Sequence, residues 1–292
     1  MERGLAEYGL VVAGGERRGI LTARCSMFTG GRWRPITPLS GPRVDACSAI
    51  VEDEDGQPEM WVMGGYDGRN FLAMVEAYNP RTNTWRSCLP LSQRRTGAVA
   101  GVVGGRLVVA GGWDGENDFE SVEAYTPTGW TPLPPLPHAA YMATACVLNG
   151  RLYVMGGFNS NKLQVLEMTE ENGLSWSCKA DLPAARRNAA SAVHEGKIWV
   201  MGGEMDGEAT ASVCVYDPSD DTWAAAPPLP YGIQAHILPA LLNSNKEVVL
   251  LADARGLLRF DRRRTQWVED GGRHIDLAPG GPGASPGALL LG

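Results

Sequence analysis

Few residues of this chain have the types and spacing that catalysis or metal binding would require. A G-x-S-x-G pattern occurs at residues 283–287. A nucleophile elbow, however, needs a strand-to-helix turn, and this pattern lies in a Gly/Pro-rich stretch. The acidic run at 52–55 lacks the remaining ligands of a calcium loop and its terminal bidentate glutamate. The histidines are far apart in the sequence, at His138, His194, His236 and His274. We therefore expect no catalytic residues, no metal site and no cofactor.

Two successive glycines recur along the chain, and a tryptophan follows each pair. The pairs begin at spacings of 50, 47, 45 and 46 residues. A self-similar unit of this length that closes an apolar strand with a double glycine is typical of a propeller blade. The pairs begin at Gly14, Gly64, Gly111, Gly156 and Gly202, and the tryptophans are Trp33, Trp85, Trp130, Trp176, Trp223 and Trp267. We expect the middle four tryptophans to pack between blades.

One repeat shows how a blade is built. Residues 60–65 form an apolar strand that ends in the glycine pair, and residues 74–78 alternate apolar and polar as a half-buried strand does. Trp85 opens a short outer strand, and residues 89–95 return to the centre. The apolar segment 96–103 then begins the next blade. This pattern predicts four antiparallel strands in each blade.

The repeats predict an all-β, six-bladed propeller that forms a single domain over residues 1–292. The last blade is degenerate, because Ala252 and Asp253 replace the double glycine. The first blade lacks an inner strand, which we expect residues 288–291 to supply so that no strand edge stays open; the alternative is a loose tail at 270–292. We place the blades at about 1–40, 41–92, 93–137, 138–183, 184–230 and 231–272, with the closing strand or tail at 273–292.

Charge and cysteine usage narrow the class of protein. The net charge of −7 argues against general binding to nucleic acid or to an anionic membrane, because both need an excess of Lys and Arg. The six cysteines form no C-x-x-C pair, and we interpret them as buried, reduced thiols. No signal peptide and no apolar run of membrane-spanning length is found. We expect a cytoplasmic or nuclear protein.

The repeat units resemble kelch repeats. The resemblance rests on the double glycine, the D-G loop, the V-E-x-Y strand, the x-P-x-T-x-x-W turn and the L-P-L return. The run GGYDGRNFLAMVEAYNPRTNTWRSCLPL, at 64–91, is close to the consensus blade of kelch-like proteins. The resemblance covers residues 5–270 and implies a propeller with one of several functions. Kelch propellers serve as substrate receptors of cullin ligases, as actin binders, as scaffolds and, rarely, as enzymes.

The resemblance also implies a binding face. In the substrate receptors that this chain resembles, arginines after the L-P return bind acidic side chains of a peptide, on the face formed by the strand 2–3 loops and the strand 4–1 returns. The matching residues are Arg43, Arg94, Arg95, Arg186 and Arg187, and the third and fifth returns hold Tyr141, Gln234 and His236 instead. Guanidinium groups suit carboxylate or phosphate. The alternative is that these arginines stabilise the propeller by bonding loop carbonyls.

Other side chains on this face would complete the contact surface. The expected apolar contacts, which could equally cover the tops of blades, are Tyr66, Trp113, Phe119, Phe158 and Tyr231. Carboxylates surround them at Asp67, Asp114, Glu116, Asp118, Asp206 and Glu208.

We expect a non-catalytic protein-interaction propeller that binds an acidic or phosphorylated peptide and presents it to a cullin-type ubiquitin ligase. The alternatives are an enzyme similar to sialic-acid epimerases or galactose oxidase, and an actin-binding scaffold. The sequence leaves oligomerisation open.

Overall fold

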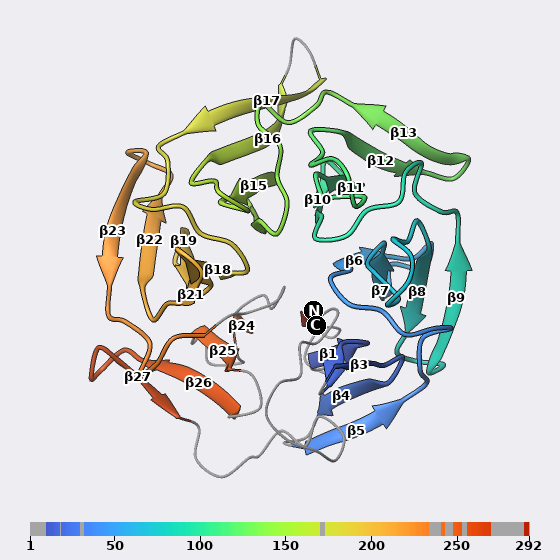
Figure 1. Cartoon of the computed structure of the whole chain (residues 1–292), viewed down its shortest axis with the longest axis horizontal. Coiled ribbons are helices and arrows are strands. Elements are labelled where there is room, and N and C mark those ends of the chain that lie inside the picture. Colours follow the sequence, from blue (N-terminus) through green and yellow to red (C-terminus); the bar gives the residue numbers. More distant parts are fainter. Residues whose placement is uncertain are drawn as a thin grey trace.

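The computed structural model describes residues 10–17, 19–29, 32–169, 173–233, 241–242, 248–252, 256–269 and 289–291. Its sheets are arranged around a central axis as the blades of a propeller (Figure 1). The described residues contain no helix, and so none that could cross a membrane. Gln234 and His236 lie outside the described residues.

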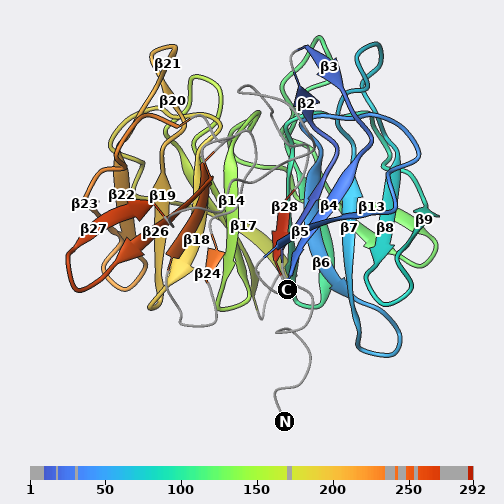
Figure 2. The ribbon, with the colours of Figure 1, turned by 90° about the horizontal axis from the view of Figure 1, so that it is seen from below.

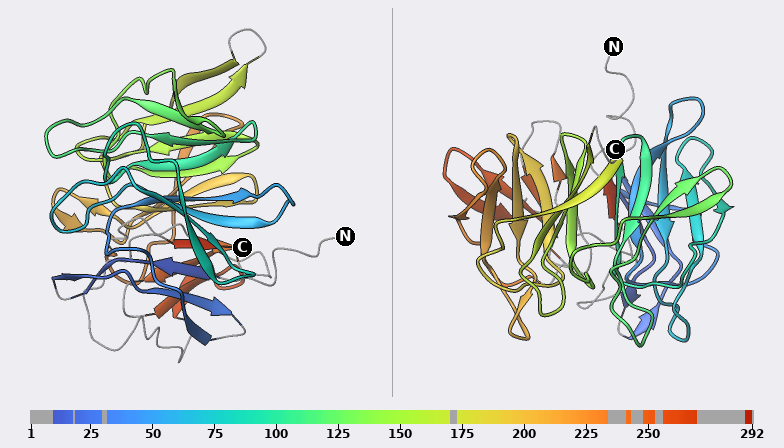
Figure 3. Two further views of the ribbon diagram at one scale, coloured as in Figure 1. Left: turned by 90° about the vertical axis from the view of Figure 1, so that its right-hand side faces the viewer. Right: turned by 90° about the horizontal axis from the view of Figure 1, so that it is seen from above.

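Each blade is a four-stranded antiparallel sheet, and Figures 2 and 3 show the ring of blades from the side. From the axis outward, the first sheets are β28 (Leu289–Leu291), β1 (Leu10–Ala13), β4 (Cys25–Thr29) and β5 (Arg32–Ile36); then β6 (Cys47–Glu52), β7 (Pro58–Met63), β8 (Val75–Asn79) and β9 (Thr84–Cys88); then β10 (Val99–Val103), β11 (Arg106–Ala110), β12 (Val122–Thr126) and β13 (Gly129–Leu133). The others are β14 (Thr144–Leu148), β15 (Arg151–Met155), β16 (Leu163–Thr169) and β17 (Gly173–Lys179); then β18 (Ala190–His194), β19 (Lys197–Met201), β22 (Val213–Asp217) and β23 (Thr222–Ala226); then β24 (Leu241–Leu242), β25 (Val248–Ala252), β26 (Gly256–Asp261) and β27 (Gln266–Glu269). The predicted all-β propeller is confirmed.

Two small hairpins mark the face on which the strand 2–3 loops emerge. They are β2 (Glu16–Arg17) with β3 (Ile20–Leu21), and β20 (Glu204–Met205) with β21 (Glu208–Ala209). Figure 2 shows both hairpins projecting on the same side of the ring. We call this side the loop face.

The two ends of the chain meet in one sheet. β28 pairs antiparallel with β1, with Val11 opposite Leu290. The inner strand that the first sheet lacks is therefore supplied by the C-terminal segment, as the sequence predicted. Residues 270–288, which precede it, lie outside the described residues.

The glycine pairs hold neighbouring blades together. Gly64 has φ of +66°, and a Cβ atom on it would lie 2.3 Å from the carbonyl oxygen of Arg95. The next residue, Gly65, donates its N–H to that same oxygen at 2.8 Å. Because Arg95 lies in the return from β9 to β10, this contact joins the end of one blade's second strand to the entrance of the next blade. Gly111 and Gly156 make the same approach, to Ala140 and Arg186.

A second set of backbone contacts links the blades at the start of their inner strands. The N–H of Gly97 donates to the carbonyl of Asp45, that of Met142 to Gly97, and that of Asn188 to Met142, at 2.8–2.9 Å. All four residues have φ between +53° and +60°, a conformation that favours glycine and asparagine. Each precedes an inner strand, so these bonds run from blade to blade around the axis.

The repeat tryptophans lie between blades, as predicted, but at the outer edge rather than deep in the core. Trp85 is half-buried, and its Nε1–H donates to the carbonyl of Thr37, in the return from the preceding blade, at 2.8 Å. Trp130, Trp176, Trp223 and Trp267 each make the equivalent bond at 2.7–3.0 Å. The cysteines are free, and Cys25, Cys47 and Cys214 are buried, but Cys178 is exposed, so the expectation that all would be buried is wrong.

We expect Gly64→Ala to destabilise the protein more than Gly105→Ala. Both positions have positive φ, +66° and +74°, but no atom lies within 4 Å of a Cβ on Gly105. The difference therefore isolates the close approach to Arg95, which we expect to cost about 1–3 kcal/mol beyond the strain common to both. Urea unfolding of the two variants measures it, and equal losses would show that the approach does not constrain the fold.

We also expect removal of residues 289–292 to lower the free energy of unfolding by several kcal/mol, because β1 would be left with an unpaired edge. Removal of Gly292 alone, which follows β28, is the control and should have little effect. Denaturant unfolding compares the two truncations. Equal stability of both would mean that the pairing of β28 with β1 contributes nothing.

Candidate functional site

Three of the five arginines expected to bind a partner are internal. Arg43, Arg95 and Arg186 are only 1%, 1% and 4% exposed. Burial lowers the pKa of each guanidinium, and for Arg43 and Arg95 the carboxylates of Glu76 and Glu123 oppose that shift. Their assignment as ligand-binding residues is therefore corrected, because a side chain this buried cannot reach a partner on the surface.

Each of these arginines links two blades. The carbonyl of Arg95 accepts the N–H of Gly65 in the blade before it. Its guanidinium donates forward, to the carbonyl of Gly111 at 2.6 Å and to the carboxylate of Glu123 at 3.0 Å. Arg43 pairs with Glu76 in the same way, and Arg186 donates to the carbonyls of Gly202 and Ser212. The alternative interpretation, in which the repeat arginines bond loop carbonyls, is right for these three.

In three blades, the residue type on the third strand matches the residue type in the return. Where the return of blade β14–β17 has Ala140 instead of arginine, the acidic residue is replaced by Gln164. Its amide accepts from the N–H of His138 at 2.8 Å and donates to the carbonyl of His138 at 3.0 Å. A neutral pair thus replaces the ion pair, so that no buried charge is left without a partner.

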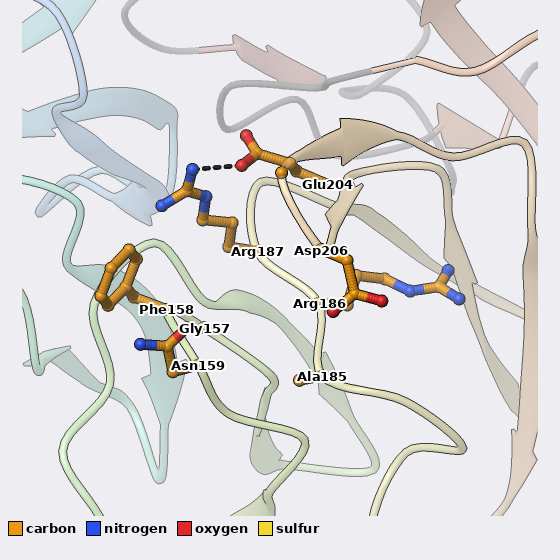
Figure 4. A pocket seen from close by; sticks show the side chains of 9 residues that line it. Gly157, Phe158, Asn159, Ala185, Arg186, Arg187, Glu204 and Asp206 are labelled. Carbon is orange, nitrogen blue, oxygen red and sulfur yellow. Dashed lines mark hydrogen bonds and ion pairs between the residues drawn. The ribbon is translucent and has the colours of Figure 1, made fainter.

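The other two arginines reach the surface. Arg94 is exposed, whereas its neighbour Arg95 is buried. The guanidinium of Arg187 is ion-paired with Glu204 and lies 4.9 Å from the ring centre of Phe158 (Figure 4). Its side chain is 30% exposed. Arg187 is therefore held in place by an anion on one side and an aromatic face on the other.

Aromatic side chains form a continuous band across the loop face. Successive ring centres are separated by 5.1, 5.1, 5.4 and 6.3 Å. Four of the rings are half-buried, and Phe158, at 43% exposed, reaches furthest into solvent. The band crosses three consecutive blades and ends beside Arg187. We define the aromatic band as Tyr66, Phe71, Trp113, Tyr141 and Phe158.

The backbone explains why these rings line up. The residue after each glycine pair donates its N–H to the return of its own blade, as Trp113 does to Thr96 at 2.9 Å and Phe158 to Tyr141 at 2.7 Å. The same position is Tyr66 in one blade and Glu204 in another, so it recurs at a fixed place on the loop face. Alignment of the repeats on their glycine pairs would have identified Glu204, which the sequence analysis missed.

Glycines let neighbouring loops pack ring against backbone. A Cβ on Gly97 would lie 2.7 Å from the ring of Tyr141, and a Cβ on Gly115 would lie 2.5 Å from the ring of Phe71. Phe71, which the sequence analysis also missed, pairs with Tyr66 across its loop. The band is therefore built from loops that fit one another rather than from independent side chains.

Tyr141 lies at the most charged part of the band. Burial raises the pKa of its hydroxyl to about 12, with further upward contributions from the charges of Asp45 and Asp118 and a downward one from Arg187. The hydroxyl stays protonated at neutral pH and can donate a hydrogen bond.

A pocket of about 220 Å³ opens beside the band. Phe158, Asn159, Arg187, Glu204 and Asp206 lie around it (Figure 4). Its volume suits one side chain of a partner, because pockets for drug-sized ligands have about 300–1,000 Å³. Among the described residues, no three His, Cys, Asp or Glu side chains lie close enough to hold a metal ion.

The fold and its face define a β-propeller whose loop face carries an aromatic surface. The Kelch motif is matched at residues 57–91, 94–137, 139–168 and 185–230, more than half of the chain. The chain therefore belongs to the kelch-repeat family, as the repeats indicated.

Similar proteins cover most of the chain. Kelch-like protein 35 of Mus musculus is 28% identical over 242 residues, which are 79% of this chain and 39% of the relative. Kelch-like protein 15 of Danio rerio is 26% identical over 272 residues, 80% of this chain and 44% of the relative. The chain thus spans about two-fifths of the length of these relatives. The solved structure of YjhT has the same fold, with a TM-score of 0.69 and 14% identity, over 88% of this chain and 96% of that one.

We expect Arg95→Ala to lower the free energy of unfolding by about 3–5 kcal/mol, because it leaves Glu123 buried without its partner. Arg94→Ala removes the same side chain one residue earlier, at an exposed position, and should change stability by no more than about 0.5 kcal/mol. Urea unfolding measures both. Similar effects of the two substitutions would contradict the conclusion that Arg95 stabilises the propeller by linking two blades. We call these contacts between blades, made by the glycine pairs and the buried arginines, the frame.

Proposed function

We propose that this chain is a non-catalytic protein-interaction propeller that holds its partner on the aromatic band. The observation that carries the proposal is the unbroken line of five rings on the loop face, with the Arg187–Glu204 pair at its end. Aromatic and arginine side chains in partly desolvated sites dominate the binding energy of protein interfaces. The rings are also fixed by their neighbours, so little conformational entropy is lost when a partner binds.

We further propose that the propeller selects substrates for a cullin-type ubiquitin ligase in the cytoplasm or nucleus. The support is the similarity to kelch-like proteins, together with the position of the band on the face that such receptors use. The module that contacts the ligase would come from outside this propeller.

The expectation of an acidic or phosphorylated partner has lost most of its basis. It rested on five arginines, of which Arg43, Arg95 and Arg186 are buried. Arg94 and Arg187 are those left to contact such a peptide, and Arg187 already has Glu204 as its anion.

We also propose that the ring has six blades, with the β28–β1–β4–β5 sheet as the one that closes it. The number of blades sets the width of the ring around the axis, and with it the spacing of the loops that carry the band. The enzyme alternative would need an acid or base free to react. In the pocket beside Phe158, Arg187 and Glu204 neutralise each other and Asp206 is the one other carboxylate, so the described lining offers no pair of acid and base, which favours a binding role.

We expect Trp113→Ala and Tyr141→Ala each to weaken partner binding by about 2 kcal/mol or more, the effect of losing an interface hot spot. Both side chains lie on loops, and Trp113 keeps its backbone bonds to Thr96, so the fold should persist. Affinity capture and mass spectrometry from cells compare wild type with the two variants, after circular dichroism has verified folding.

Trp130→Ala is the control for loss of a half-buried tryptophan away from the loop face. Partners lost from the band variants but kept by this control would support the proposal. An unchanged list of partners from all variants would move the interaction to another surface and overturn it.

A further inference from the structure

Around the aromatic band, the loop face is acidic once the buried arginines are set aside. In the loops and returns of the blades that hold the band and the Arg187–Glu204 pair, the cations outside the buried arginines are Arg69, Arg94, Lys162 and Arg187. Two of these are already matched, since Lys162 pairs with Asp181 and Arg187 with Glu204. The carboxylates that remain in the same segments are Asp45, Asp67, Asp114, Glu116, Asp118, Glu120, Asp206 and Glu208.

These carboxylates act on the aromatic band itself. The charges of Asp45 and Asp118 both act on the hydroxyl of Tyr141, which lies between Trp113 and Phe158 in the band. Asp118 is exposed and forms a backbone bridge with Trp113, so its carboxylate belongs to the same loop as that ring. Asp114 follows Trp113 directly and accepts two backbone N–H groups, which lower the pKa of its carboxyl and keep it ionised. Half-buried rings and ionised carboxylates are thus interleaved.

One cation already occupies the end of this surface. The guanidinium of Arg187 lies over Phe158 at 4.9 Å and pairs with Glu204. An aromatic face on one side and a carboxylate on the other is the arrangement that favours a bound cation. Trp113 and Tyr141, with Asp118 beside them, offer the same combination of aromatic rings and a carboxylate. At Phe158 and Glu204 the cation between these groups is Arg187, a residue of the propeller itself.

We propose that the aromatic band binds a basic segment of a partner protein, with an arginine or lysine side chain against Trp113 and Tyr141 and Asp118 as its counter-ion. This inference rests on the proposed function, because it names the chemistry of the partner at the same face. It reverses the sign of the partner that the arginines had implied. The reversal follows from burial, since three of the five arginine side chains that suggested an acidic ligand lie inside the blades.

The test uses two labelled peptides of equal length, one with arginines spaced by glycine and proline and one with glutamates in their place. Fluorescence anisotropy measures their affinity for the propeller. We expect the arginine peptide to bind and the glutamate peptide not to bind. Tyr141→Ala and Asp118→Asn should each weaken the arginine peptide by about tenfold, within the range of a cation–π contact or a charged pair.

Asp55→Asn is the matched control for Asp118→Asn. Asp55 is an exposed aspartate in the β6–β7 hairpin, which emerges on the opposite face, and its substitution removes the same charge. Binding that is unchanged in Asp55→Asn but weaker in Asp118→Asn supports the inference. Equal weakening by both would show attraction to net charge alone, and binding of the glutamate peptide would reverse the sign; either result overturns it.

Cross-linking separates this inference from the proposed function. A photo-reactive residue placed at Phe158 in the full chain would label the segment of the cellular partner that lies on the band. A labelled segment with arginines or lysines supports the basic partner. A labelled segment without them, on a partner that Trp113→Ala releases, would leave the interaction face standing and overturn the charge assignment.

Discussion

The structure depends on one contact that repeats from blade to blade. The α-carbon of the first glycine in each pair lies against a carbonyl oxygen of the following return, at a distance that leaves no room for a side chain. The second glycine donates its N–H to the same oxygen. A single carbonyl therefore sets both the distance and the direction between neighbouring blades. The tryptophan bonds, the bonds between inner strands and the positions of the loops all follow from this spacing.

The buried arginines show how one return provides a residue that links two blades and another that lies on the loop face. Arg94 and Arg95 are adjacent, as are Arg186 and Arg187, yet one of each pair is internal and the other is on the loop face. Neighbouring residues of an extended segment point to opposite sides, so a pair of arginines can supply both. The carbonyl of the internal arginine accepts a hydrogen bond from the preceding blade, and its guanidinium donates hydrogen bonds within the following blade. Burial of the charge is balanced by Glu123 at Arg95, and by two carbonyls and the hydroxyl of Ser212 at Arg186.

The fold could be predicted from the sequence because its key contact joins a glycine to a backbone carbonyl, and every residue type has that carbonyl. Any side chain would collide at the first glycine, so the glycines must recur wherever the contact does. The binding residues were harder to predict, because a return arginine can point inward or outward. The signal was nevertheless present: Arg43 and Arg95 occur with Glu76 and Glu123, whereas Ala140 occurs with Gln164. Read together, these pairs indicate an internal ion pair rather than a ligand site.

The charge of the loop face then depends on which side chains are buried in the contacts between blades. Three of the return arginines, Arg43, Arg95 and Arg186, lie inside the blades, where they bind carbonyl and carboxylate groups. The loops keep their aspartates, because a short side chain that caps its own turn, as Asp67 does for Arg69 and Asn70, stabilises the loop locally. Three of the five band residues, Tyr66, Trp113 and Phe158, directly follow a glycine pair, at a position whose place the contacts between blades fix but whose residue type they do not. Buried arginines in three returns and aspartates on the loops thus leave an acidic surface around the aromatic band.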